Sequence, residues 1–152
     1  MQQTLELDFD PSMDGVTHVN VYSKGKTSLG RWLSNFTHEP IETEDGPFNS
    51  IEGYWYWLGC RHDRLRVLSG FAAKQFGREC EKAVVLGPLE FRAKVCRAIR
   101  VKALQRPDML AELRANQLPL AHYYVFNNKV KPAGGEWILD CWRAVARDHV
   151  ET

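Results

Sequence analysis

The segment from Ile51 to Trp57 combines one carboxylate, Glu52, with four consecutive aromatic residues after a glycine. On a helix, Trp55 and Tyr56 lie three and four positions after Glu52 and therefore share its face. A carboxylate among indole and phenol rings loses part of its hydration, which raises its pKa toward the range useful for proton transfer. The same rings can stack on a flat heterocycle. The alternative is that Glu52 only caps the positive end of the helix and the rings belong to the core.

Cations form the second group of candidates. Lys74 and Arg78 lie four positions apart, so a helix places both on one face, which suits a phosphate or a diphosphate. A solvated basic face is the alternative. Lys102 falls in the apolar stripe of a helix that spans residues 91–105, where a lysine must be paired, extend to solvent or line a cavity. Residues 91–106 also hold six cations and no acid, which favours local contact with a phosphate backbone.

Other motifs in the sequence are weaker. Gly25-Lys26-Thr27 follows an expected strand, as in a phosphate-binding loop, but Asn20 stands where that motif needs its first glycine. Gly30 and Trp32 also make the next segment a poor helix start. The five histidines are scattered without metal-ligand spacing, and the four cysteines form no C-x-x-C pair. We therefore expect no metal and no cofactor.

Length and composition exclude several classes of protein. The 152 residues are typical of one domain, and 44% of them are hydrophobic, which excludes disorder for the bulk of the chain. Twenty Lys and Arg against nineteen Asp and Glu give a net charge of +1, which argues against a generic binder of polyanions or of anionic membranes. The N-terminus has no signal-peptide pattern, and no apolar run is long enough to cross a membrane. We expect a cytoplasmic protein with four free thiols, although the cysteines could pair in a secreted one.

Hydrophobic periodicity and turn residues predict an α+β fold, mainly helical, in a single domain over residues 1–152. Short strands are expected near the N-terminus and around 122–126, specifically at 5–9, 19–22 and 122–126, with an extended segment at 33–41 and a loop at 131–135. Helices are expected from Asn49 or Ser50 to 57 and at 63–68, 72–84, 89–105, 108–115 and 137–147.

Four motifs in order resemble the YbiA-like, or NADAR, family. The S-N-F-x-x-x-P element is present as Ser34-Asn35-Phe36 with Pro40, and the family's glutamate helix is matched by residues 50–55, with Glu52 at the glutamate. The A-K-x-x-G-R element spans Ala73 to Arg78. A later K-x-x-Q-x-P-x-x-L pattern is met by Lys102, Gln105, Pro107 and Leu110. Residues 134–139 look like the start of the family's closing helix, so the resemblance covers about residues 34–143.

The sequence departs from the family pattern at two points. The family's histidine after the glutamate is Gly53 here, and its aspartate falls near Asn127 and Asn128, which offer amides instead. The missing carboxylate puts a mechanism with two carboxylates in doubt. Both departures favour the alternative of a module that binds ADP-ribose or NAD without cleaving it.

The resemblance implies an enzyme, an N-glycosidase or ADP-ribosyl hydrolase, that cleaves the bond between a base and a phosphorylated ribose. It implies that Glu52 orients the ribose or activates water as a general base, and that Trp55 and its neighbours shield the transition state. The implied substrate-binding residues are Ser34, Asn35, Phe36, Tyr54, Trp55, Lys74, Arg78, Lys102, Asn127 and Asn128.

Two substrates are implied by the family. One is ADP-ribose attached to guanine in DNA, and the other is a ribosylamino-pyrimidine phosphate intermediate of riboflavin synthesis. The acid-free basic run of residues 91–106 and the short chain favour ADP-ribosylated guanine. We therefore expect an antitoxin-like protein that reverses DNA ADP-ribosylation. The expected partners are therefore ADP-ribose or a phosphoribosyl substrate and ADP-ribosylated DNA, without a membrane.

Overall fold

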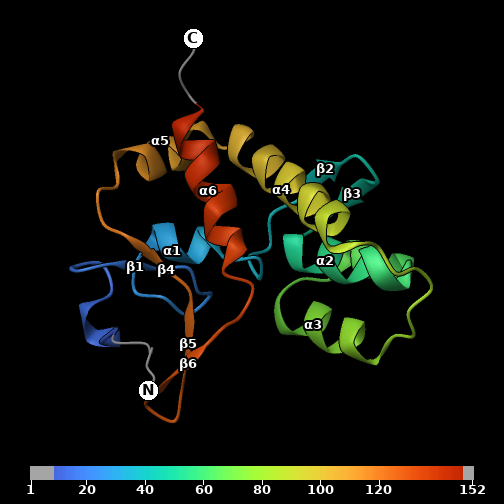
Figure 1. The fold of residues 1–152 in the computed structure, drawn as a ribbon, viewed down its shortest axis with the longest axis horizontal. Coiled ribbons are helices and arrows are strands. Elements are labelled where there is room, and N and C mark those ends of the chain that lie inside the picture. Colours follow the sequence, from blue (N-terminus) through green and yellow to red (C-terminus); the bar gives the residue numbers. More distant parts are fainter. Residues whose placement is uncertain (1–8, 149–152) are drawn as a thin grey trace.

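Helices and three pairs of short strands form an α+β fold in the computed structural model, which describes residues 9–148 (Figure 1). The helices are η1 Pro11–Met13, α1 Ser28–Leu33, α2 Ile51–Cys60, η2 Asp63–Val67, α3 Gly70–Glu79, α4 Pro88–Leu104, α5 Pro107–Ala115 and α6 Trp137–Arg147, where η denotes a 3-10 helix. The strands are β1 Val19–Asn20, β2 Ile41–Thr43, β3 Gly46–Phe48, β4 Leu120–Ala121, β5 Tyr123–Phe126 and β6 Lys129–Pro132.

One of the three strand pairs connects distant parts of the chain, and the other two join neighbouring segments. β1 pairs in parallel with β4, so the first described strand lies beside residues about a hundred positions later. β2 and β3 form one antiparallel hairpin, and β5 and β6 form another. The Asn20 side chain also joins β1 to the start of β5, because its amide nitrogen donates to the Tyr123 carbonyl and its oxygen accepts from the Tyr123 N–H, both at 3.0 Å.

Helix α2 begins after Ser50, one of the two expected caps, and packs closely against its neighbours. The Ser50 side chain accepts a hydrogen bond from the Gly53 N–H, which satisfies one of the free donors of the first turn. A Cβ added at Gly53 would lie 2.3 Å from the Leu65 carbonyl oxygen. The close contact between α2 and η2 therefore requires glycine at position 53, directly after Glu52.

Helix α1 contradicts the expectation that Gly30 and Trp32 oppose a helix after Thr27. The Thr27 side chain caps it by accepting from the Gly30 N–H. Gly30 is needed for a second reason, since a Cβ there would lie 2.2 Å from the Asn20 carbonyl oxygen. The glycine thus serves close packing of α1 against β1, and Trp32 is buried beneath it.

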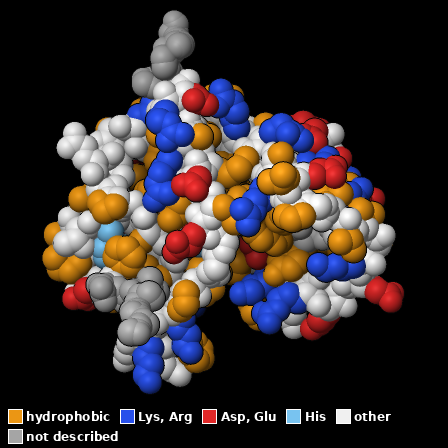
Figure 2. Space-filling model, viewed as in Figure 1, with side chains coloured by type: hydrophobic (Ala, Val, Ile, Leu, Met, Phe, Trp, Pro, Cys, Tyr) orange, Lys and Arg blue, Asp and Glu red, His pale blue; other side chains and the backbone are white. Residues whose placement is uncertain are grey.

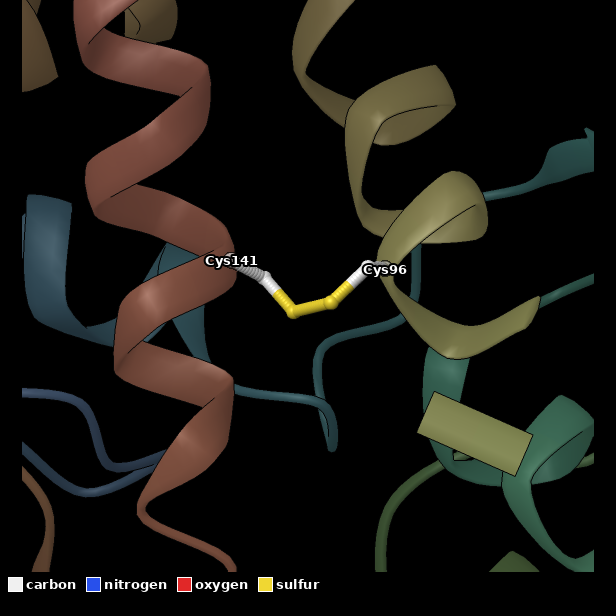
Figure 3. Close-up of a disulfide and its surroundings, with 2 residues drawn as sticks. All are labelled: Cys96 and Cys141. Atoms are coloured by element: carbon white, nitrogen blue, oxygen red, sulfur yellow. A yellow bond between two sulfur atoms is a disulfide. The ribbon is translucent and has the colours of Figure 1, made fainter. Parts of the chain in front are cut away.

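The core lies between α1, α2, α4 and α6. Leu33, Leu58, Leu65, Ile99 and Trp142 are fully buried there, and each such side chain contributes about 1.5–3 kcal/mol by leaving water. Helices α4 and α6 lie side by side and are joined by a disulfide between Cys96 and Cys141, whose Cα atoms are 5.4 Å apart (Figure 3). The expectation of four free thiols was wrong for this pair, because the fold brings together cysteines that lie 45 positions apart. Cys60 and Cys80 are free.

Other boundaries differ from the expected ones in specific places. The helix expected at 72–84 ends at Glu79, and the loop expected at 131–135 begins with the end of strand β6. The segment expected to be extended from 33 begins with the last residue of α1. The strand expected at 5–9 falls, except for Phe9, outside the described residues. No helix among residues 9–148 is both long and apolar enough to span a membrane.

Candidate functional site

One cavity, of about 240 Å³, gathers the motifs that sequence analysis singled out. Its walls come from the segment after β1, the loop after α1, α2, α3, β5 and the start of α6. Figure 2 shows the surface hollowed between the part formed by β5 and β6 and the part formed by α3. The expected residues that line this cavity are Ser34, Asn35, Phe36, Glu52, Trp55 and Lys74.

Glu52 lies in the first turn of α2 and is only 9% exposed. Burial raises the pKa of its carboxyl group to about 7, and the nearby Lys74 ammonium opposes part of that rise. No hydrogen bond from the described residues reaches the carboxylate. Glu52 is therefore a cavity-lining acid that is partly ionised near neutral pH, which suits it to accept or donate a proton.

The loop that carries Ser34, Asn35 and Phe36 is held from two sides. The Glu52 N–H, a free donor of the first turn of α2, donates to the Asn35 carbonyl oxygen at 3.0 Å. The Ser34 Oγ accepts from the Phe36 N–H at 3.2 Å. The Asn35 side-chain oxygen Oδ1 is buried and has no hydrogen-bond partner among residues 9–148. A buried orphan acceptor in a cavity wall marks a place where a ligand donor would be satisfied.

Lys74 supplies the cation of the cavity. Its Nζ lies 5.3 Å from the centre of the Tyr124 ring and 5.9 Å from that of Phe36, so two aromatic faces hold the ammonium group in place. Arg78 is exposed and does not line the cavity. It shares the face of Lys74 on α3 but lies one turn further along the axis, about 6 Å away. Of the expected pair of cations, the structure therefore brings only Lys74 to Glu52.

The indole of Trp55 forms a wall of the cavity. It stacks on Trp137 with ring centroids 5.5 Å apart and meets Phe91 edge-on at 4.9 Å. Tyr56 lines the cavity next to it and packs so tightly on α3 that a Cβ at Gly77 would lie 2.2 Å from its ring. A second cavity, of about 330 Å³, is lined by the same Trp55 and Tyr56. The two aromatic residues thus separate two neighbouring hollows.

Tyr54 was expected to contact substrate, and the structure places it in the core instead. Its side chain is completely buried, packs on Phe48, and donates its hydroxyl to Asp45 Oδ2 at 2.6 Å. The reason is helical geometry, because a residue two positions after Glu52 points about 200° away from it. The ring therefore stabilises α2 against the β2–β3 hairpin.

Lys102 was expected to be a cationic contact, and it lies behind the cavity wall. The residue is 1% exposed, and its Nζ donates to the Ser34 carbonyl oxygen at 3.0 Å. Its ammonium group also lies 5.4 Å from the Trp32 ring centre and 5.8 Å from that of Trp142. Burial lowers its pKa to about 7. Lys102 does not extend to solvent as a surface lysine would, and it supports the loop that carries Asn35.

Asn127 and Asn128 were expected to stand where the NADAR family, which the sequence resembles, has its aspartate. The structure places them at the exposed turn between β5 and β6, outside the cavity. Both have positive φ, 52° and 62°. A two-residue hairpin turn of this kind requires positive φ at both positions, and asparagine tolerates it better than most residues. Turn geometry therefore accounts for both residues.

The acid-free basic run of residues 91–106 was expected to contact phosphate, but most of its cations form salt bridges with acids of the same chain. Four of its six cations pair with acids of the same chain, three of them on α4 and one just after it. Arg92 instead lies against the Trp137 ring, and Lys102 is buried. The pairs are Lys94 with Glu44 and Asp45, Arg97 with Glu44, Arg100 with Asp148, and Arg106 with Glu39 and Asp108.

His122 also lines the cavity, although the sequence did not lead us to expect it there. Its Nδ1 lies 2.8 Å from the Val21 carbonyl oxygen, which can only accept, so Nδ1 carries the proton and Nε2 is left as an acceptor. Burial lowers its pKa and favours the neutral ring. The period-two alternation of the expected strand places His122 and Tyr124 on one face, and both line the cavity. Among residues 9–148 no cluster of His, Cys, Asp and Glu could hold a metal ion.

Comparison with solved structures relates this arrangement to a known fold. The NMR structure of the E. coli protein YbiA aligns with 88% of this chain and 89% of its own, with a TM-score of 0.64 and 20% sequence identity. The chain has a fold similar to that of YbiA. At 20% identity the likeness to YbiA is one of fold. No protein-family model matches the sequence, and no curated protein matches it.

Proposed function

We propose that the chain is an N-glycosidase that hydrolyses the bond between a nitrogenous base and a phosphorylated ribose in the Glu52 cavity. The observation that carries this proposal is the buried carboxyl group of Glu52 beside one cation and an aromatic wall, and burial raises the pKa of that group to about 7. A glycosidic bond needs an acid–base group near neutrality, a phosphorylated sugar needs a cation, and a base needs a ring to stack on. The YbiA-like motifs and fold agree with this chemistry.

In the proposed reaction, ionised Glu52 accepts a proton from the water that attacks C1′ of the ribose. The new C1′–O bond forms as the C1′–N bond breaks, and the base leaves with the electron pair of that bond and takes up a proton. The net proton transfer is from water to the base. Lys74 holds a phosphate oxygen, and Trp55 keeps bulk water from the positively charged sugar. Asn35 Oδ1 and His122 Nε2 accept hydrogen bonds from the sugar or the base.

We further propose that the leaving group is guanine in DNA and that the sugar belongs to ADP-ribose. The two hollows that meet at Trp55 and Tyr56 support an extended substrate, with the reacting ribose beside Glu52 and the adenosine part beyond the aromatic wall. A ribosylamino-pyrimidine phosphate would need the first hollow alone. The basic run of residues 91–106 no longer argues for DNA, because four of its six cations are paired with acids, Arg92 lies against Trp137 and Lys102 is buried.

The experiment is to incubate the protein with guanine-ADP-ribosylated DNA and with the ribosylamino-pyrimidine phosphate, and to measure released ADP-ribose or ribose phosphate by mass spectrometry. Glu52→Gln should abolish release, and wild-type kcat/KM should rise with pH up to about 7 as the carboxyl group ionises. Glu90→Gln is the matched control, because Glu90 is an exposed glutamate in the first turn of α4.

Three results would change the proposal. Release from the pyrimidine substrate alone would replace the DNA substrate. Micromolar binding of ADP-ribose without turnover of either compound would make the chain a binding module. Unchanged release by Glu52→Gln would refute the mechanism.

A further inference from the structure

The β5–β6 hairpin has two chemically different faces. Its register pairs Tyr124 with Lys131 and Phe126 with Lys129. Cross-strand partners lie on the same face, and residues two apart in a strand also share a face. One face of the hairpin therefore carries Tyr124, Phe126, Lys129 and Lys131. We call it the hairpin platform.

The hairpin platform continues the wall of the Glu52 cavity. Tyr124 lines the cavity, and its ring lies 5.3 Å from Lys74 Nζ. Further toward the turn, Phe126 is 62% exposed, and Lys131 Nζ lies 6.0 Å from its ring centre. Aromatic rings and ammonium groups thus alternate from the cavity to the hairpin tip.

The lysines of the hairpin platform differ from the cations of α4. Lys129 and Lys131 are exposed and form no salt bridge with any residue among 9–148. From residue 113 to residue 135 the sequence contains no acid. Figure 2 shows Lys and Arg side chains over the end of the molecule to which β5 and β6 extend in Figure 1. This local positive charge exists although the whole chain is nearly neutral.

We propose that the hairpin platform binds the single-stranded DNA that flanks the modified guanine. This proposal rests on the proposed function of the Glu52 cavity. A flanking base stacks on Phe126, and the neighbouring phosphates contact Lys129 and Lys131. Single-stranded nucleic acid is bound in this way elsewhere, by aromatic rings that accept any base and by cations that follow the backbone. The Asn127-Asn128 turn fixes the geometry, because positive φ at both residues holds Phe126 opposite Lys129.

The test is fluorescence anisotropy of a labelled twelve-nucleotide single strand, unmodified, over a series of KCl concentrations. The variant K129A/K131A removes two cations, so the slope of log affinity against log salt should fall by about 1.4 in magnitude. Phe126→Ala should weaken binding about five-fold or more without changing that slope, since it removes stacking and no charge.

The matched control is R114A/R147A, which removes the same charge from an exposed position on α5 and another in the last turn of α6. In Figure 1, α5 and the C-terminal end of α6 lie away from the hairpin. The affinity of this control for the single strand should stay within about two-fold of that of wild type. A control that weakens binding as much as K129A/K131A would overturn the hairpin platform in favour of general charge attraction, and a wild type that does not bind the strand would also overturn it. Circular dichroism checks that every variant is folded.

A second measurement separates this proposal from that for the Glu52 cavity. Release of ADP-ribose is followed on ADP-ribosylated guanosine and on the ADP-ribosylated strand. The hairpin platform predicts that K129A/K131A lowers kcat/KM on the strand more than on the nucleoside. Equal loss on both overturns the platform while leaving the glycosidase intact. Strand binding that depends on the platform, without release from either compound, refutes the glycosidase and supports the platform.

Discussion

Replacing Glu52 with glutamine should stabilise the protein at neutral and alkaline pH. The wild-type carboxyl group is buried, so the folded protein keeps its proton up to a pH of about 7, whereas the unfolded chain loses it near the ordinary value of 4.5. Between these values the folded state binds more protons than the unfolded state, and the free energy of unfolding therefore falls as the pH rises. Glutamine fills nearly the same volume and has no such titration.

The size of the effect follows from the shift in pKa. Each unit corresponds to about 1.4 kcal/mol, and a shift from 4.5 to about 7, integrated between pH 5 and pH 8, gives about 2.5 kcal/mol. The stability of E52Q relative to wild type should grow by this amount over that interval. Contributions from other titrating groups appear in both proteins and cancel in the difference.

Urea unfolding at pH 5, 6, 7 and 8, followed by circular dichroism, measures the difference without any knowledge of the substrate. E90Q provides the comparison, because Glu90 is exposed and its removal should leave a nearly constant offset from wild type. A constant separation between E52Q and wild type from pH 5 to pH 8 would refute the reasoning. It would mean that Glu52 is hydrated in the folded protein and has no special role as an acid or base.

Three further predictions concern other groups. Burial lowers the Lys102 pKa to about 7, so as the pH rises the folded state gives up this proton before the unfolded state does. Between pH 7 and pH 9, the free energy of unfolding of wild type, measured in urea, should therefore rise by about 2 kcal/mol relative to that of Lys102→Met. Parallel plots of unfolding free energy against pH for the two proteins would contradict this. Lys74→Met should raise the KM for a phosphorylated ribose substrate about ten-fold or more, whereas Arg78→Ala should change it less, and equal effects would place both cations on the substrate. Loss of the Cys96–Cys141 link in C96S/C141S should lower the free energy of unfolding by about 4 kcal/mol in the chain-entropy model, and an unchanged urea midpoint would show that the link does not form.

Features set by neighbouring residues could be predicted from the sequence. The Ser50 cap, the helical face shared by Glu52, Trp55 and Tyr56, and the closing helix from 137 to 147 all depend on spacings of a few residues. The rise in the Glu52 pKa was also predicted in direction from the adjacent rings. Local geometry was thus enough to find the centre of the cavity.

Features set by distant residues could not be predicted in this way. Three cations of α4 pair with Glu44 or Asp148, about fifty positions away, and only the fold brings these groups together. Lys102 donates to a carbonyl 68 positions earlier, which no periodicity reveals. At Gly30 the sequence predicted no helix because glycine has a low helix propensity, but α1 forms there because its close packing against β1 requires a glycine.

The stacked indoles of Trp55 and Trp137 give the cavity an optical property. Their rings lie 5.5 Å apart at an angle of 15°, close enough for their electronic transitions to couple, and Trp55 forms part of the cavity wall. A compound that enters and stacks on Trp55 must alter this coupling, and the change should appear in the near-ultraviolet circular dichroism. Trp137→Phe, which breaks the pair but keeps an aromatic ring, identifies the coupled band. A library of nucleotides can therefore be screened for ligands before any reaction has been observed.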